Sequence, residues 1–135
     1  MREYDSVSEI LSTIKESVSK GKYFISLNKN RGDNIAFRNK YELSSKDQKQ
    51  IILNLTEEDY EKSVSNYKEG YENEKLHIFG PILNLKNEEG KSKKVQVYIK
   101  FNIIKDNDNL VVVVSFHEAR RPMILASCKN KVLLT

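Results

Sequence analysis

Four polar side chains in the C-terminal half of the chain combine groups that can move protons and bind anions. They are the side chains of Gln96, Tyr98, Lys100 and His117. An imidazole titrates near neutrality and can therefore accept or donate a proton. An ammonium group and a phenol can bind and position an anion such as a phosphate. Whether these groups act together depends on the elements that carry them.

A predicted β-hairpin brings these groups to one face of a sheet. From Val95 to Ile103 apolar residues alternate with polar ones, which predicts a strand with one buried face. The residues at 106–109 favour a turn, so the segment Leu110–Phe116 is expected to return as an antiparallel strand. Registers that keep the apolar faces together pair an even position on one strand with an odd one on the other; one of them places His117 opposite Tyr98, and the neighbouring one places it opposite Gln96.

The same pairing assigns the two faces of the second strand. One face is expected to join the core, and the other to share the surface that carries Tyr98 and Lys100. The expected core residues are Val112, Val114 and Phe116, and the expected residues of the polar face are Val111, Val113, Ser115 and His117.

Two helices are predicted early in the chain. Apolar residues from Tyr4 to Val18 recur at spacings of three and four, which predicts an amphipathic helix over residues 3–20 that ends at Gly21. Ser45 and Gln48 have the spacing of a capping box, which predicts a second helix over residues 46–54.

A third, short helix is predicted to follow at once. Thr56 and Asp59 have the spacing of another capping box. On this helix Tyr60 and Val64 are expected to face inward, because they are four residues apart. Lys62 then lies off the apolar stripe and is free to reach a site elsewhere.

The other segments are predicted from turn residues and short apolar runs. We expect strands at 22–28 and 131–135, a basic loop at 29–34 around Gly32, a polar loop at 66–75, and a strand at 76–85 that Gly80 and Pro81 interrupt. The predicted fold class is α+β, with an N-terminal helix and two short helices packed on an antiparallel, meander-like β-sheet.

Length and composition limit the class of protein. A chain of 135 residues with 39% apolar residues suits one domain, 1–135, with a single core. The single cysteine, Cys128, excludes an internal disulfide and a Cys-rich metal site. No apolar run approaches the length of a membrane span, and the N-terminus is charged where a signal peptide is apolar. We therefore expect a cytoplasmic protein.

The charge is slightly basic, with 23 basic and 19 acidic residues and a net charge of +4. The basic residues are clustered, which is compatible with RNA or an acidic protein as the partner. The clusters are Lys29, Arg31, Arg38 and Lys40; Lys91, Lys93 and Lys94; and Arg120, Arg121, Lys129 and Lys131.

Three blocks of the chain also carry a family resemblance. They read LTEEDYEKSVSNY, VQVYIKFNII and LVVVVSFHEA, and they lie within residues 55–118, about half of the chain. Their order, spacing and residue types resemble toxins of the MqsR family. The Ser-Phe-His ending and the segment from RGDN to FRNK are more similar to an uncharacterised sister group of these toxins.

The resemblance implies a RelE-like α+β fold and the toxin of a type II toxin–antitoxin system. Such a toxin is a metal-independent endoribonuclease that cuts mRNA and is held inactive by a cognate antitoxin protein. By matched position, the functional lysine of the family falls on Lys62 and its tyrosine on Tyr98. The family has a lysine where this chain has His117, and His77 lies near the place of a family glutamine.

Metal-independent cleavage of RNA needs few groups. The ribose 2′-hydroxyl is the nucleophile, so the protein must accept its proton, protonate the leaving 5′-oxygen and stabilise the charged phosphorane. His117 is the expected proton carrier, and Tyr98 is expected to position a phosphate oxygen or assist proton transfer. The expected phosphate ligands are Lys62, Lys100, Arg120 and Arg121, and the expected further RNA contacts are Arg38, Gln96 and His77. We expect no metal and no cofactor, a 2′,3′-cyclic phosphate product, and no cleavage of DNA.

Alternative interpretations stay open at this point. A polar strand face is ordinary for an antiparallel sheet with one side in water, and His77 could be purely structural. Arg120 and Arg121 could bind an acidic antitoxin segment instead of RNA. The chain could therefore also be a non-catalytic RNA- or protein-binding module of the same fold, or a protein whose basic rim serves only a partner chain.

Overall fold

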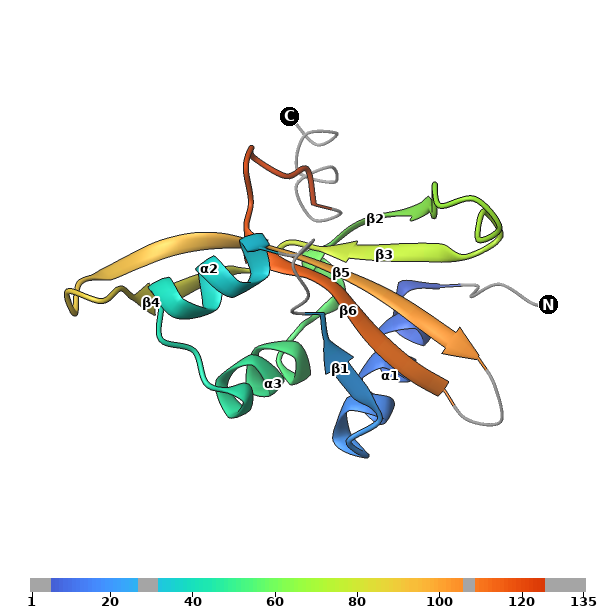
Figure 1. Cartoon of the computed structure of the whole chain (residues 1–135), viewed down its shortest axis with the longest axis horizontal. Coiled ribbons are helices and arrows are strands. Elements are labelled where there is room, and N and C mark those ends of the chain that lie inside the picture. Colours follow the sequence, from blue (N-terminus) through green and yellow to red (C-terminus); the bar gives the residue numbers. More distant parts are fainter. Residues whose placement is uncertain (1–5, 27–31, 106–108, 126–135) are drawn as a thin grey trace.

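A six-stranded mixed sheet with three helices on one of its faces forms the fold (Figure 1). The structure is a computed structural model and describes residues 6–26, 32–105 and 109–125. The elements are α1 (Val7–Ser19), β1 (Tyr23–Ile25), α2 (Gly32–Lys40), α3 (Ser45–Leu53), the single 3₁₀ turn η2 (Glu57–Asp59), β2 (Tyr60–Ser65), β3 (Lys75–Phe79), β4 (Ile82–Lys86), β5 (Ser92–Lys105) and β6 (Asn109–Glu118). The predicted α+β class is confirmed.

The strand order of the sheet is β1-β6-β5-β3-β2, and β4 pairs with the N-terminal part of β5. All pairs are antiparallel except β1 and β6, which are parallel. The prediction of an antiparallel meander is therefore wrong for β1. β1, which follows α1, is an edge strand of the sheet and pairs with β6, the last described strand of the chain. Most of the other helices and strands lie between β1 and β6 in the sequence.

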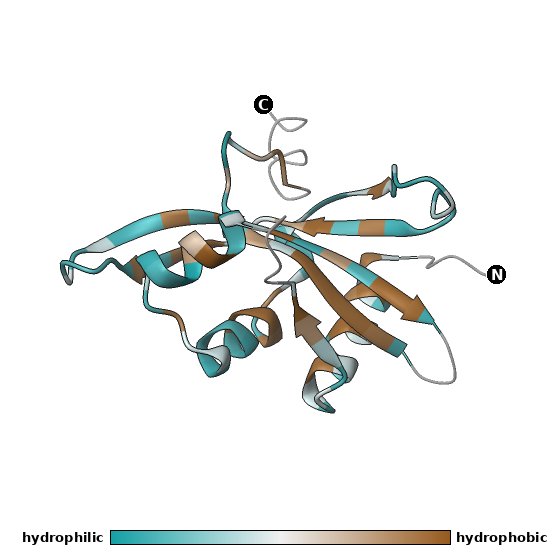
Figure 2. Cartoon of the chain, viewed as in Figure 1, coloured by the Kyte–Doolittle hydropathy of each residue, from teal (hydrophilic) through white to brown (hydrophobic). Residues whose placement is uncertain are grey.

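One hydrophobic cluster fills the space between the helices and the sheet. Its fully buried members include Ile14 and Val18 from α1, Ile52 from α3, and Ile99 and Phe101 from β5. Figure 2 shows β6 hydrophobic over most of its length, as expected for a strand in the middle of the sheet. Among the described residues, no helix covers the opposite face of the sheet.

The predicted hairpin of β5 and β6 is confirmed, including one of its two expected registers. Tyr98 pairs with His117 and Ile99 with Phe116. Beyond Lys100 the register shifts by one residue, because Val114 is an extra residue in β6.

This β-bulge reverses the predicted faces of the first half of β6. Val111 and Val113 are fully buried in the core, whereas Val112 and Val114 are only half-buried. The assignment of Val112 and Val114 to the core is therefore wrong. It holds for Phe116, which lies beyond the bulge and has no exposed surface.

The first helix agrees with its prediction within the described residues. Ser6 is its N-cap and accepts a hydrogen bond from the amide of Glu9, and Gly21 follows its end with a φ of 76°. A positive φ is a conformation that glycine adopts without strain. Tyr4, which was expected on the apolar stripe, lies outside the described residues, as do Cys128 and the predicted strand at 131–135.

The segment predicted as a basic loop begins a helix instead. Residues Gly32–Lys40 form α2, and only the part of the predicted loop at 27–31 lies outside the described residues. Tertiary packing overrides the turn propensity here. Phe37 is buried against Phe116, with ring centroids 5.9 Å apart, and Asn34 is also buried.

Of the two predicted capping boxes, the one of Ser45 and Gln48 is wrong by one residue, and the one of Thr56 and Asp59 forms. In α3 the box pairs Ser44 with Asp47, so the helix begins one residue earlier than predicted. Asp59 bonds back to the amide of Thr56 as expected, yet the helix ends after the single turn η2. Residues Tyr60–Ser65 form β2, so the predicted helical placement of Lys62 is wrong.

The interrupted strand at 76–85 is confirmed as β3 and β4, separated by Gly80 and Pro81. After β6 the chain leaves the sheet and crosses its helix-free face as an irregular segment, residues 119–125, which we name the strap. Among the described helices, none has both the length and the apolar composition needed to span a membrane.

Candidate functional site

A cleft of about 760 Å³ opens on the helix-free face of the sheet. It lies between the start of α2, the strands β2, β5 and β6, and the strap. Its lining residues are Gly32, Asp33, Asn34, Glu61, Lys62, Tyr98, Lys100, Ser115, His117, Ala119, Arg120, Arg121, Pro122 and Met123.

The cleft brings together six of the nine residues predicted to form the site. All four expected catalytic residues line it, and so do two of the expected RNA-binding residues. These six residues are Lys62, Tyr98, Lys100, His117, Arg120 and Arg121. They come from β2, β5, β6 and the strap, so the sheet assembles the cluster from distant parts of the chain.

Strand register explains why the side chains share one face. His117 pairs directly with Tyr98, and their rings are stacked with centroids 5.3 Å apart and planes inclined by 11°. Lys62 and Lys100 both pair with Ile78 of β3, from its two sides, and therefore lie on the same face. The ammonium groups and the aromatic pair thus border one space.

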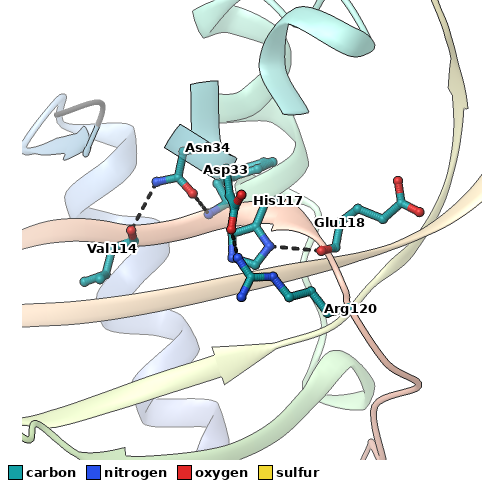
Figure 3. A network of polar contacts seen from close by, with 7 residues as sticks. Asp33, Asn34, Val114, His117, Glu118 and Arg120 are labelled. Carbon is teal, nitrogen blue, oxygen red and sulfur yellow. Dashed lines mark hydrogen bonds and ion pairs between the residues drawn. The ribbon is translucent and has the colours of Figure 1, made fainter. Parts of the chain in front are cut away.

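The hydrogen bond of His117 fixes which ring nitrogen can act. Nδ1 lies 2.9 Å from the backbone carbonyl oxygen of Glu118 (Figure 3). A carbonyl oxygen only accepts hydrogen bonds, so Nδ1 carries the proton and the neutral ring has its lone pair on Nε2. The carboxylate of Glu118 is engaged elsewhere, because it accepts a hydrogen bond from Tyr41 and lies 3.8 Å from the Lys40 ammonium.

The phenol of Tyr98 is held in its protonated form. Its pKa is raised above its ordinary value, first by burial and then by the negative charge of Glu61, against the opposing charge of Arg121. At neutral pH Tyr98 is therefore a hydrogen-bond donor to an anion in the cleft.

Glu61 is a cleft residue that the sequence reasoning missed. A register shift between Tyr60 and Lys62 allows Glu61 and Lys62, although adjacent in sequence, both to line the cleft. Its Oε2 accepts a hydrogen bond of 3.0 Å from the amide of Ile124, which fastens the strap. The only sign of this role in the sequence is that Glu61 is an acidic residue next to Lys62, the lysine matched by the family resemblance.

Asn34 is the second residue that was missed, and it joins α2 to the bulge of β6 (Figure 3). Its Nδ2 donates to the carbonyls of Ser26, at 2.8 Å, and Val114, at 3.1 Å, and its Oδ1 accepts from the amide of Phe116 at 2.8 Å. The side-chain amide therefore stands where β1, which ends at Ile25, would otherwise continue to pair with β6. The contact fixes the backbone next to His117.

An ion pair between Asp33 and Arg120 spans the mouth of the cleft (Figure 3). Both side chains are largely in solvent, with exposed fractions of 54% and 75%. An exposed ion pair contributes about 0–1 kcal/mol, so a phosphate group can displace Asp33 from this guanidinium.

Three predicted RNA-binding residues are not among the residues that line the cleft. Gln96 holds the strap instead, because its Nε2 donates to the carbonyl of Gly80 and its Oε1 accepts from the amide of Met123. Arg38 lies in the last turn of α2. His77 pairs with the core residue Phe101 and is therefore on the opposite face of the sheet.

His77 is buried and belongs to a chain of hydrogen bonds. Its Nδ1 lies 2.6 Å from the hydroxyl of Ser63, which in turn lies 2.9 Å from the hydroxyl of Tyr60. Burial, helped by the charge of Lys105, lowers the pKa of His77 to about 4. The imidazole is therefore neutral at physiological pH and has a structural role.

The stability of the fold is expected to fall in acid because of His77. In the unfolded chain this histidine binds a proton below about pH 6.5, whereas in the folded chain it does so only near pH 4. The contribution of His77 to the free energy of unfolding is complete above pH 6.5. It falls between pH 6.5 and 4, by as much as roughly 3 kcal/mol. Urea unfolding of the wild type and of His77→Gln at both pH values measures it. An equal pH dependence in the two proteins would contradict this assignment.

Comparisons with known proteins add no relative: no family model, curated protein or solved structure matches the chain.

Proposed function

We propose that this protein is a metal-independent endoribonuclease that cuts mRNA, the toxin of a type II toxin–antitoxin pair. The observation that carries the proposal is the convergence of His117, Tyr98, Lys62 and Lys100 in one cleft with two arginines at its rim. This combination supplies a proton acceptor, a hydrogen-bond donor and several fixed cations around a space that suits a phosphate group.

Each group has a role in the proposed reaction. Nε2 of His117 removes the proton of the ribose 2′-hydroxyl, whose oxygen attacks the adjacent phosphorus. The bond from phosphorus to the 5′-oxygen breaks, the leaving oxygen takes a proton from water, the His117 imidazolium releases its proton to solvent, and the product ends in a 2′,3′-cyclic phosphate. Lys62, Lys100 and Arg121 stabilise the negative charge of the phosphorane, and the Tyr98 phenol donates to one of its oxygens.

Cleavage of a defined RNA in the presence of EDTA tests the activity. We expect strand cleavage without added metal, and products that carry a 2′,3′-cyclic phosphate detectable by mass spectrometry. A matched oligonucleotide with 2′-deoxy or 2′-O-methyl sugars is expected to bind but to resist cleavage, because it lacks the nucleophile. If the purified protein binds RNA tightly and never cuts it, the chain is a non-catalytic binding module.

The toxin role is tested separately in cells. Expression of the chain is expected to arrest growth, and co-expression of the adjacent open reading frame, as the antitoxin, is expected to restore it. The exposed guanidinium of Arg120 at the cleft mouth is a suitable contact for an acidic antitoxin segment that blocks the substrate. Normal growth on strong expression of soluble, RNA-cutting protein would separate the enzyme from the toxin role.

A further inference from the structure

The face that carries the cleft continues beyond it onto a two-stranded extension of the sheet. We name this extension the arm; it consists of residues 82–86 of β4 and 92–96 of β5, joined by the turn at 87–91. Side chains two residues apart in a strand share a face, so Gln96, Lys94 and Ser92 lie on the same face as Tyr98. Their partners across the arm are Ile82, Asn84 and Lys86.

The two faces of the arm differ in composition. One face turns toward the core, where Leu83, Leu85 and Val95 join the hydrophobic cluster. The other face is exposed: Ile82 has 62% of its surface in solvent, and Lys86 and Lys94 are also exposed. Among the described elements no helix lies over this second face (Figure 1). It therefore offers two cations and one apolar side chain on a bare surface.

At the opposite end of the cleft face lies a loop with a negative net charge. Asn102, two residues beyond Lys100 on β5, donates a hydrogen bond to Glu74 of the loop at 66–74. This loop also contains Glu69 and Glu72 against one lysine, Lys68. Asn66 donates a second hydrogen bond to Glu74 within the loop, and the bond from Asn102 holds the loop against the sheet. A polyanion bound in the cleft is repelled at this end and attracted toward the arm.

We propose that the arm binds the RNA strand that flanks the nucleotide held in the cleft, with Lys86 and Lys94 as phosphate ligands. This inference rests on the proposed function. From Tyr98 to Ser92 a strand advances about 20 Å, which is long enough for several nucleotides. Arg121 of the strap adds a cation to the cleft, and the strap is bonded through Met123 to Gln96, where the arm begins. Charge complementarity favours RNA, and exposed Ile82 offers an apolar contact to a base.

Binding of uncleavable RNA tests this inference with a control of equal charge. The arm variant is Lys86→Gln with Lys94→Gln, and the control is Lys46→Gln with Lys93→Gln. Lys93 lies on the same arm but on its other face, and Lys46 lies on α3. Fluorescence anisotropy over a range of salt concentrations measures the affinity of each protein for 2′-O-methyl RNA of four and of twelve nucleotides.

We expect the arm variant to bind the twelve-nucleotide RNA about tenfold more weakly than the wild type at low salt. Its slope of log affinity against log salt is expected to fall by about 1.4, the value for two lost phosphate contacts to a single strand. The four-nucleotide RNA, which is too short to occupy the cleft and the whole arm together, is expected to lose less than twofold. The control variant is expected to bind both RNAs within about twofold of the wild type.

Four results would overturn the inference. If the arm variant and the control weaken equally, net charge and not the arm determines binding. If neither weakens while the wild type still cuts RNA, the arm is not a binding surface and the proposed function stands. If a polyglutamate peptide binds the wild type more tightly than the twelve-nucleotide RNA does, and loses this affinity in the arm variant, the arm serves an acidic protein. A wild type that neither binds nor cuts RNA would reject the proposed function as well.

Discussion

Replacement of His117 by alanine is expected to slow RNA cleavage by roughly 100- to 10,000-fold, the usual contribution of a general base or acid. The change removes Nε2, which the hydrogen bond at Nδ1 leaves as the proton acceptor in the cleft. Single-turnover cleavage of a labelled RNA at saturating protein measures the rate without a contribution from binding. The affinity for uncleavable RNA is expected to change by less than threefold, because the cations of the cleft remain.

Tyr98→Phe is a second variant for the same experiment, which tests the phenol separately from the imidazole. Phenylalanine retains an aromatic ring that can stack on His117 but lacks the phenol that donates to the phosphate. We expect a smaller loss of about tenfold, in the range of a single hydrogen bond to a charged group. If His117→Ala keeps the wild-type rate while the fold is intact by circular dichroism, the imidazole is not a proton carrier and the proposed mechanism is wrong.

Replacement of Asn34 by alanine is expected to destabilise the folded protein by about 4 kcal/mol. The side chain is 1% exposed and makes three hydrogen bonds to backbone groups of Ser26, Val114 and Phe116. Alanine leaves these groups unpaired where solvent reaches them poorly, and each unpaired group costs about 1–3 kcal/mol. Urea unfolding at pH 7 measures the change in the free energy of unfolding.

Two further variants distinguish the hydrogen bonds from general effects on α2. Asn39→Ala changes an exposed asparagine of the same helix and is expected to alter stability by less than about 0.5 kcal/mol. Asn34→Asp keeps the acceptor for Phe116 but places a carboxylate against two carbonyl oxygens, so it is expected to destabilise nearly as much as alanine. A stable Asn34→Ala protein would show that water replaces the amide at the bulge.

The sequence predicted the hairpin of β5 and β6 well, because alternation and turn chemistry are local signals. Keeping two apolar faces together left two registers open, with His117 opposite Tyr98 or Gln96, and the structure has the first of them. The bulge at Val114 could not be predicted, because Val111 to Val114 are four identical residues and offer no difference between faces. Only the packing of Val111 and Val113 against the core decides which pair is buried.

Other parts of the site depended on tertiary contacts that local patterns do not record. Lys62 reaches the cleft as predicted, but from a strand: pairing with β3 replaces the helix that the capping box of Thr56 begins. The helix α2 was missed as a whole: Gly32 and Asn34 are turn formers, and the buried contacts of Asn34 involve residues up to 82 positions away. Gln96 and His77 were chosen for their chemistry, yet their hydrogen bonds serve the strap and β2.

The extra residue in β6 divides this strand into two parts in which the odd-numbered residues lie on opposite faces of the sheet. On its N-terminal side the odd-numbered residues Val111 and Val113 fill the interior, whereas beyond it the odd-numbered Ser115 and His117 line the cleft. Val114 is therefore the position in β6 at which the odd-numbered side chains change from the core face to the cleft face. Beyond Val114, Ser115 and His117 can change with the chemistry of the cleft while Phe116 between them keeps the interior filled, so the reactive surface can vary without a change in the core.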